Sequence, residues 1–432
     1  MPRLHYRPLT FLLTGFGWLV LSSIVGLAIL IGLVRGTPLP PWIRHAHVHA
    51  ALVGGVAQMI LGGFLAFISP LLMSGQHQRE SHPVLFLTIN TGTVGMLVGF
   101  WLHQYVLIGA AGFLVIGAFL SLARDAWSQA RRGLNFPPLK LWLYMIAFLA
   151  LLISLACGET MAFGLAQQSY GYVRLAHIHL NILGFITLVI VGTVHTLLPA
   201  VLNVPLHSPL LARTVFIVLP LGVAVLLVGF LNSSVPLEII AGGILFFGVT
   251  LYAMNVFWTW QASEHKGSAV LDHLLIGTFF LLLTIVLGIL VGVNSLSSPP
   301  LMPFGSLHLI AYTHMALVGF ILQTIMGVLS YVVPTTLAVS RVPNTKKRGP
   351  YLDQLTQLID RWRTIQVAGL SLGTMGLGVL ASLTWNVPLT SLYIRIATWT
   401  CFGLLLASLT LFSIKLAVVL VRQPEDSTPS TS

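Results

Sequence analysis

Twelve stretches of this chain are each long and apolar enough to cross a lipid bilayer, and they take up most of its 432 residues. A helix needs about 20 apolar residues to cross the roughly 30 Å hydrocarbon layer. Charged residues make up 7% of the chain, against about 25% in soluble domains, so little is left to build a water-facing surface. The stretches run near 9–34, 46–73, 83–104, 106–123, 140–163, 175–199, 210–232, 236–260, 269–294, 306–334, 364–385 and 389–421.

The sequence therefore predicts an all-α integral membrane protein with about twelve transmembrane helices. We expect them to form a single helix-bundle domain over residues 1–423, because no polar stretch between them is long enough to fold by itself. Residues 424–432 are polar and short, and we expect them to be a disordered cytoplasmic tail.

The positive charge of the chain follows this membrane topology. The net charge is +11, from 21 basic and 10 acidic residues. With both termini in the cytoplasm, an excess of the basic residues falls inside, which is the positive-inside rule. We therefore expect a protein of the inner (cytoplasmic) membrane and no nucleic-acid binding, since the charges are not gathered on one face. The basic residues expected on the outer side are Arg35, Arg44, Arg174 and Arg395.

Three segments of the chain repeat at similar spacing. In chain order they read HVHAALVGG, HIHLNILGF and YTHMALVGF, and a proline follows downstream in each. Such internal similarity indicates repeated structural units. We expect three pseudo-equivalent units of four helices, with the repeated segments in the second, sixth and tenth helices. The units run over about 9–123, 140–260 and 269–421.

The histidines of these segments are the residues best suited to carry chemistry. The topology places them in the first helical turns on the outer side, at one depth. An ionisable side chain in lipid is costly and normally faces the bundle interior, and neutral imidazole is a common ligand of haem iron and copper. A single histidine near a helix end is usually an interfacial residue, but repeated copies can converge. The histidines concerned are His47, His49, His177, His179 and His314.

Helical geometry limits how each histidine pair can act. Within an HxH pair the two rings differ by about 200° around the helix, so one is expected to bind a metal and the other to face a different site. His45 and His49, four residues apart, share a face. Arg44 and Arg174 directly precede the histidine clusters, and they suit either the propionates of a haem or the membrane interface.

Glycines follow the shared histidines at a constant spacing. Gly54, Gly184 and Gly319 each stand five residues after His49, His179 and His314, respectively. A glycine leaves room either for a flat ring or for a close contact between helices. The sequence is compatible with both roles.

On these segments the chain resembles subunit I of the haem-copper oxidase superfamily, whose members have twelve helices in three groups of four. RHAHVHAALVGG, HIHLNILGFITLVIVGTVHTLLP and HLIAYTHMALVGFILQTIMGVLSYVVP look like the second, sixth and tenth helices of that family. The resemblance implies a low-spin haem b with His314 and either His47 or His49 as its axial ligands. The repeat register favours His49, because it aligns with His314.

The chain departs from that family at the second metal site. Tyr312 stands where the tenth helix of the family has a histidine, and the seventh helix lacks the family's two copper-binding histidines. The resemblance therefore implies a short, divergent member in which a second haem or a copper ion is held differently. The opening YRPLTFLLTGFG and the histidine-rich second helix are also similar to the NnrS-like haem and copper membrane proteins. Candidate ligands for the second site are His177, His179, His45, His308 and Tyr312.

The leading functional hypothesis is a haem-binding relative of the oxidase subunit that handles nitric oxide or oxygen, or relays electrons with a cytochrome or cupredoxin partner. An oxidoreductase activity would depend on the second metal site, and proton pumping is not expected because polar groups deep in the helices are few. An alternative is a transporter or copper-handling permease that uses the outer histidines, and a third is an anchor subunit without cofactors. The deep polar residues are Gln58, Asn90, Glu159, His195 and Gln323.

Overall fold

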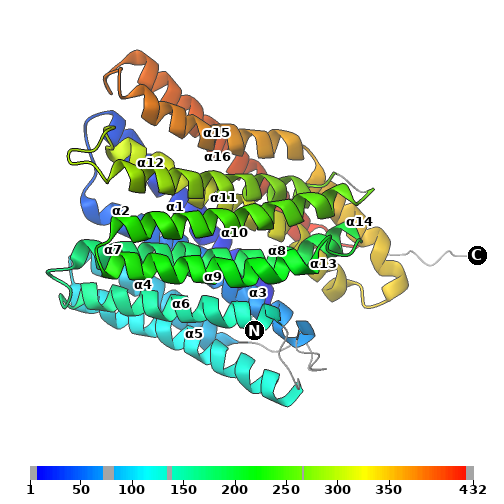
Figure 1. Cartoon of the computed structure of the whole chain (residues 1–432). Coiled ribbons are helices and arrows are strands. Elements are labelled where there is room, and N and C mark those ends of the chain that lie inside the picture. The colour runs from blue at the N-terminus through cyan, green and yellow to red at the C-terminus, as the bar shows by residue number, and fades with distance from the viewer. Residues whose placement is uncertain (1–6, 72–81, 134–138, 265–266, 425–432) are drawn as a thin grey trace, which may run out of the picture.

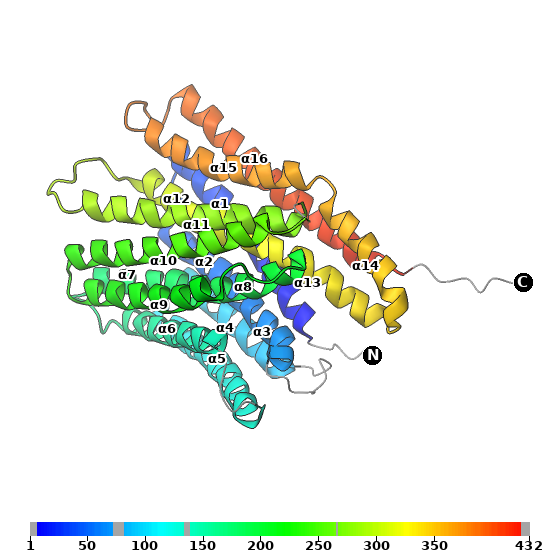
Figure 2. The ribbon, with the colours of Figure 1, turned by 45° about the vertical axis from the view of Figure 1, so that its right-hand side comes forward.

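The computed structural model describes residues 7–71, 82–133, 139–264 and 267–424, and every regular element within these ranges is a helix. Twelve of the described helical spans are long and apolar enough to cross a membrane. They run side by side as one bundle (Figures 1 and 2). The predicted all-α membrane fold is confirmed. Of the tail predicted to be disordered, only Pro424 lies within the described residues.

Nine of the spans are uninterrupted α-helices. Their bounds lie within three residues of the predicted ones, except that α5 continues ten residues past 123 because the polar sequence that follows the apolar run still forms helix. They are α1 (Pro8–Val34), α4 (Pro83–Leu102), α5 (Tyr105–Gly133), α6 (Leu139–Ala162), α9 (Pro209–Leu231), α10 (Val235–Gln261), α11 (Ala269–Asn294), α15 (Arg363–Leu383) and α16 (Leu392–Val421).

The second, sixth and tenth spans share an unusual backbone. In each, an α-helix ends at the shared histidine, eight residues of π-helix follow, and α-helix resumes. π-Helices are rare and occur mostly as single turns near functional sites. The pieces are α2 (Pro41–His49), η1 (Ala50–Ala57) and α3 (Gln58–Leu71); α7 (Tyr170–His179), η2 (Leu180–Thr187) and α8 (Leu188–Leu202); and α12 (Ser306–His314), η3 (Met315–Leu322) and α13 (Gln323–Arg341).

Two of these composite spans begin earlier than their apolar sequence does. α2 starts at Pro41 and α7 at Tyr170, five residues before the predicted starts near 46 and 175. Proline at the first helical position supplies a fixed φ and lacks the amide proton that would be unpaired there. The histidines consequently lie in the second and third turns of their spans, deeper than the first-turn positions expected from the sequence.

Glycines bring consecutive spans into close contact. The pairs α4 with α5, α9 with α10 and α15 with α16 all pack in this way, as small residues allow between membrane helices. A Cβ atom at Gly92, Gly222 or Gly373 would lie 2.9, 2.8 or 2.8 Å from the side chain of Val115, Leu245 or Leu405, respectively.

The linker between the tenth and eleventh spans forms α14 (Thr345–Asp360). Its buried residues Tyr351, Leu355 and Ile359 are spaced four apart and so lie on one face. The start of α1, the end of α16 and α14 all lie at one end of the bundle, and α2, α7 and α12 lie toward the other (Figure 2). The histidine segments are thus gathered at one end.

Candidate functional site

The first histidine of the first two segments is fixed by the preceding span. Nδ1 of His47 lies 2.8 Å from the carbonyl oxygen of Ser22, and Ser22 Oγ donates to the His47 carbonyl at 2.9 Å. His177 repeats these contacts with Ser154 at 2.7 and 2.8 Å. Because a carbonyl can only accept, Nδ1 carries the proton in both rings and Nε2 keeps its lone pair.

The shared histidines are fixed by their own helices. Nδ1 of His49, His179 and His314 donates to the carbonyl oxygens of His45, Leu175 and Ile310 at 2.8, 2.8 and 2.7 Å, respectively. Histidines that bind a metal through one nitrogen commonly donate the proton of the other in this way. The histidine pairs therefore offer Nε2 as a ligand atom.

The two histidines of the first pair face different neighbours, as the helical offset predicts. His47 lies against Ser22 of α1, whereas the ring of His49 lies 4.7 Å from the ring of Phe100 in α4. His45 stacks on the same Phe100 at 5.6 Å and 22°, so it shares the face of His49 as expected. Each pair thus serves two interfaces between spans.

The rings of different spans come together in pairs. The ring centres of His49 and His177 lie 6.5 Å apart, with 22° between the ring planes. His314 has His47 within electrostatic range. The expected pairing of His49 with His314 stays a prediction. The offset of about 200° within an HxH pair lets His49 face His177 while His47 faces another interface.

Two of the candidate metal ligands lie apart from these pairs. The ring of His179 is 4.8 Å from that of Phe230, beside an apolar crevice too narrow for a water molecule. His308 stacks on Trp385 at 5.3 Å and 19°. Across the residues that the structure describes, no three His, Cys, Asp or Glu side chains gather where they would hold a metal ion. The candidate copper ligands are therefore dispersed over several interfaces.

A glycine lies opposite the first residue of each repeated segment, which is His47, His177 or Tyr312. This pattern was not expected from the sequence. Each glycine of this set stands four residues after a hydroxyl residue, in the patterns Ser22–Gly26, Ser154–Gly158 and Thr284–Gly288. A Cβ atom at Gly26, Gly158 or Gly288 would lie 2.7, 3.1 or 2.9 Å from an atom of His47, His177 or Tyr312, respectively. Tyr312 thus takes, in the third segment, the place of His47 and His177.

The glycines downstream of the shared histidines serve close helix packing. A Cβ atom at these positions would meet a side chain of the preceding span, so the room that they leave is already filled. Gly54, Gly184 and Gly319 face Trp18, Ala150 and Phe280, respectively. Of the two roles open from the sequence, the structure supports contact between helices.

The environment of the histidines fits the axial ligands of a haem. Their side chains are enclosed by protein, yet each is only half-buried. The residues that follow them, Ala50, Leu180 and Met315, are almost fully buried. A low-spin bis-histidine haem takes two imidazole donors, and the rings of His49 and His177 present such a pair.

Arg44 and Arg174 converge near the His49–His177 pair. Arg44 and Arg174 are both exposed, and both lie within electrostatic range of His45. His45 in turn shares Phe100 with His49. The guanidinium groups therefore lie on the side of the interface between α2 and α7.

A second cluster of polar side chains lies nearer the end of the bundle that holds α14. Of its members, only Gln323 stood out in the sequence. His273 is fully buried, and its Nδ1 donates to Gln323 Oε1. Its Nε2 accepts from Gln366 Nε2 at 2.8 Å. Lys415 Nζ donates to Gln366 Oε1 at 2.6 Å, and Gln323 Nε2 to Ser371 Oγ at 3.0 Å. We call these five residues the inner network.

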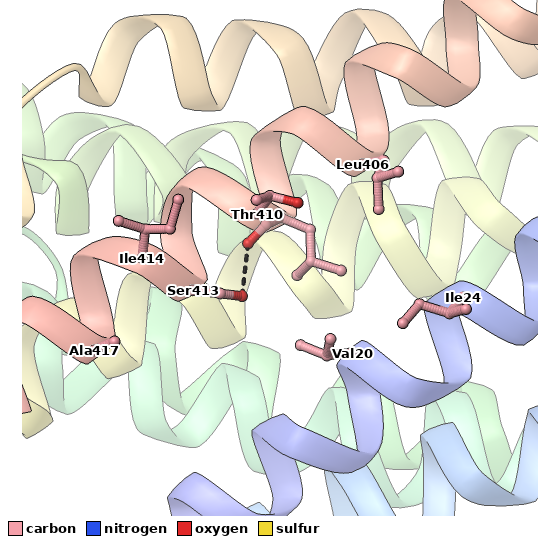
Figure 3. A pocket seen from close by; sticks show the side chains of 8 residues that line it. Val20, Ile24, Leu406, Thr410, Ser413, Ile414 and Ala417 are labelled. Carbon is pink, nitrogen blue, oxygen red and sulfur yellow. Dashed lines mark hydrogen bonds between the residues drawn. The ribbon is translucent and has the colours of Figure 1, made fainter.

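A groove of about 360 Å³ between α1 and α16 is separate from both groups (Figure 3). Its lining is mostly apolar, including Val20, Ile24 and Leu406, and the Ser413 hydroxyl donates to the Leu409 carbonyl at 2.8 Å. Exposed apolar side chains border it, Ile24 at 53% among them. None of its lining residues is titratable.

Comparison with known proteins bears on the fold. No protein-family model matches the chain. Over 157 residues the chain is 31% identical to an uncharacterized protein of Aquifex aeolicus (strain VF5), and this match covers 36% of this chain and 40% of that protein. The structure is similar to that of a haem-copper terminal oxidase dimer, with a TM-score of 0.68 and 12% identity over 96% of this chain and 83% of that chain. The predicted oxidase-like fold is confirmed, and the likeness to the NnrS-like group stays a prediction.

Proposed function

We propose that this chain, which has the fold of a haem-copper terminal oxidase, binds haem b in the membrane with His47 and His314 as axial ligands. The observation that supports this most is the state of the two rings. Nδ1 of each donates to a backbone carbonyl, and no described residue hydrogen-bonds to Nε2 of either. Imidazoles held in this way can bind iron without first breaking another contact.

The residues around the pair have defined parts in this proposal. Ser22 holds the His47 ring and carbonyl, and so fixes both the tautomer and the direction of the ring. Gly26 leaves the space that the His47 ring occupies. A bis-histidine haem supplies one-electron transfer when bound. Because two imidazoles would hold the iron, we propose electron relay as the function of this site. The handling of nitric oxide or oxygen would need a further site that leaves room for the gas.

The membrane topology is part of the same proposal. The recurrence of the π-helical spans and of the Ser/Thr–Gly patterns supports three four-helix units. The placement of basic residues supports cytoplasmic termini and a histidine end on the outer side. An electron donor or acceptor, such as a cytochrome or cupredoxin subunit, would then dock at the outer end.

One observation favours the alternative of a permease. Gln58 of α3 is 0% exposed, and neither of its amide atoms has a hydrogen-bond partner among the described residues. A buried amide without partners is costly, and a passing ion or water would satisfy it. The test below separates this alternative from haem binding.

The test is an absorption spectrum of detergent-purified full-length protein, oxidised and dithionite-reduced, with a pyridine haemochrome assay and metal analysis. We expect sharp reduced α and β bands, weakened in both His47→Ala and His314→Ala. The matched control is His195→Ala, because His195 also bonds its Nδ1 to its own helix but packs between Phe216 and Tyr252. A well-folded, colourless protein would overturn the proposal and favour the permease.

A further inference from the structure

We infer that the chain holds a second haem, with His49 of α2 and His177 of α7 as its axial ligands. This inference rests on the proposed haem function and deepens it, because it assigns the ligands of a site at a different interface. It uses neither His47 nor His314. The starting observation is the meeting of the two rings, with centres 6.5 Å apart and planes 22° apart.

The separation of the rings suits two imidazoles on opposite sides of one metal atom. A metal–imidazole bond is about 2 Å long and Nε2 lies about 1 Å from the ring centre, so two such rings have centres about 6 Å apart. The observed 6.5 Å is close to this value. The two stacked pairs without a metal between them, His45 with Phe100 and His308 with Trp385, are closer, at 5.6 and 5.3 Å.

Both rings are held in the tautomer that a metal requires. His49 Nδ1 donates to the His45 carbonyl at 2.8 Å, and His177 Nδ1 to the Ser154 carbonyl at 2.7 Å. The one side chain that could compete for His177 Nε2 among the described residues is Asn181, whose Nδ2 lies 3.5 Å away. That distance is too long for a strong hydrogen bond, so the nitrogen remains able to bind.

The donor set distinguishes a haem from a bare metal ion. Zinc and copper sites in proteins usually use three or four protein ligands, and no group of three His, Cys, Asp or Glu is found among the described residues. A haem supplies four nitrogens itself, and a low-spin haem takes two axial ligands from the protein. His49 and His177 supply that number, and the flat ring of Phe100 lies 4.7 Å from His49.

The arginines provide an independent argument for a haem at this interface. Arg44 stands five residues before His49 and Arg174 three before His177, and both lie within electrostatic range of His45. Two guanidinium groups match the two propionate carboxylates of a haem. In the third segment the corresponding position is Leu309, so the arginines occur only in the two segments that contribute to this pair.

The experiment counts haem per polypeptide in the detergent-purified full-length protein and its variants, by pyridine haemochrome and iron analysis. We expect two haems in the unmodified protein. His49→Ala and His177→Ala should each leave one, His314→Ala should leave the other, and the His177→Ala/His314→Ala double variant should leave none. His195→Ala, on the same span as His177, is the control and should keep both.

A second readout separates ligation from general damage to the fold. His177→Met should keep two haems and raise the midpoint potential of one of them, because methionine ligation raises the potential of haem iron. A single haem in the unmodified protein that survives His177→Ala but not His314→Ala would overturn this inference and leave the proposed function standing. Copper or zinc lost with His177→Ala while the haem content is unchanged would also overturn it. Absence of haem from every sample would overturn both proposals.

Discussion

His273 of the inner network and the histidines of the outer pairs (His49 with His177, and His47 with His314) differ in what their ring nitrogens contact. His273 is fully buried, whereas the paired histidines are half-buried. In the inner network both nitrogens of His273 have side-chain partners, Gln323 and Gln366. In the outer pairs Nδ1 is bonded to a backbone carbonyl while Nε2 has no strong partner, as in His49 and His314. The first arrangement is complete without a ligand, and the second is half complete.

The difference shows that the hydrogen-bond partners of a histidine, and not its burial alone, indicate whether it can bind a ligand. A buried polar group is costly unless it is hydrogen-bonded, and the inner network meets that cost by joining α11, α13, α15 and α16 through one set of bonds. The outer histidines meet it only on one side of each ring. We therefore propose a structural role for the inner network and ligand binding for the outer pairs, and the following predictions test this contrast.

The largest expected effect concerns haem content. The His177→Ala/His314→Ala variant should lose all haem, because it removes one ligand from each outer pair. His273→Ala should keep the haem content of the unmodified protein in the fraction that folds, as measured by pyridine haemochrome after size exclusion. Haem lost from folded His273→Ala would break the distinction between the two groups.

The next effect is on stability, and here the substitution in the inner network is expected to have the large effect. His273→Ala leaves the amides of Gln323 and Gln366 without their partner, and we expect it to lower the free energy of unfolding by about 2–5 kcal/mol. The matched control is His207→Ala, an exposed histidine, with an expected change within about 0.5 kcal/mol. Denaturant unfolding of the haem-free proteins in one detergent gives the comparison, and equal stability of the two variants would contradict a structural role.

A smaller effect should follow from filling the space beside a ligand. Gly26→Ala places a Cβ atom 2.7 Å from Cε1 of His47, so the ring must shift, and we expect haem affinity at that site to fall at least about tenfold. Gly17 lies on the same helix and has nothing within 4 Å of such a Cβ. Haem titration of Gly26→Ala against Gly17→Ala measures the difference, and equal affinities would exclude His47 as a ligand.

The two serines should separate the two outer pairs. Substitution by alanine removes a hydroxyl that donates to a histidine carbonyl and lies 2.9 Å (Ser22) or 3.3 Å (Ser154) from the ring Nδ1. The expected cost is about 1 kcal/mol, or roughly fivefold in affinity. Ser22→Ala should weaken the haem of His47 and His314, and Ser154→Ala that of His49 and His177. Haem titrations in the His177→Ala and His314→Ala backgrounds resolve the sites, and an effect of Ser154→Ala on the His314 haem would contradict the pairing.

The smallest effect concerns the positive charge of the two arginines near the His49–His177 site. The Arg44→Gln/Arg174→Gln variant removes two positive charges beside the His49–His177 site, which favours the oxidised haem and lowers its midpoint potential. Because both side chains are exposed and screened, we expect no more than about 59 mV, a tenfold change for a one-electron couple. Arg35→Gln is the control. Equal midpoint potentials of the two variants in a redox titration would show that Arg44 and Arg174 do not act on the haem.

The sequence alone predicted which residues are candidate ligands but not which of their rings meet. The shared histidines, Tyr312 and both arginines were visible because repeats and charge are properties of the linear chain. The pairing of His49 with His177 was missed, because it depends on how each helix is rotated about its axis. The Ser–Gly patterns opposite the rings were missed for the same reason, since they become meaningful only when α1 and α6 pack against α2 and α7.

What the sequence by itself determined is the number, length and order of the helices, because a bilayer imposes a local requirement that each span must satisfy with its own residues. What only the tertiary structure decided is which polar groups meet. Gln366 and His273 are 93 residues apart in the chain, and no local pattern joins them. The depth of the histidines in the second and sixth spans was likewise decided by helix starts at Pro41 and Tyr170, before the apolar sequence begins.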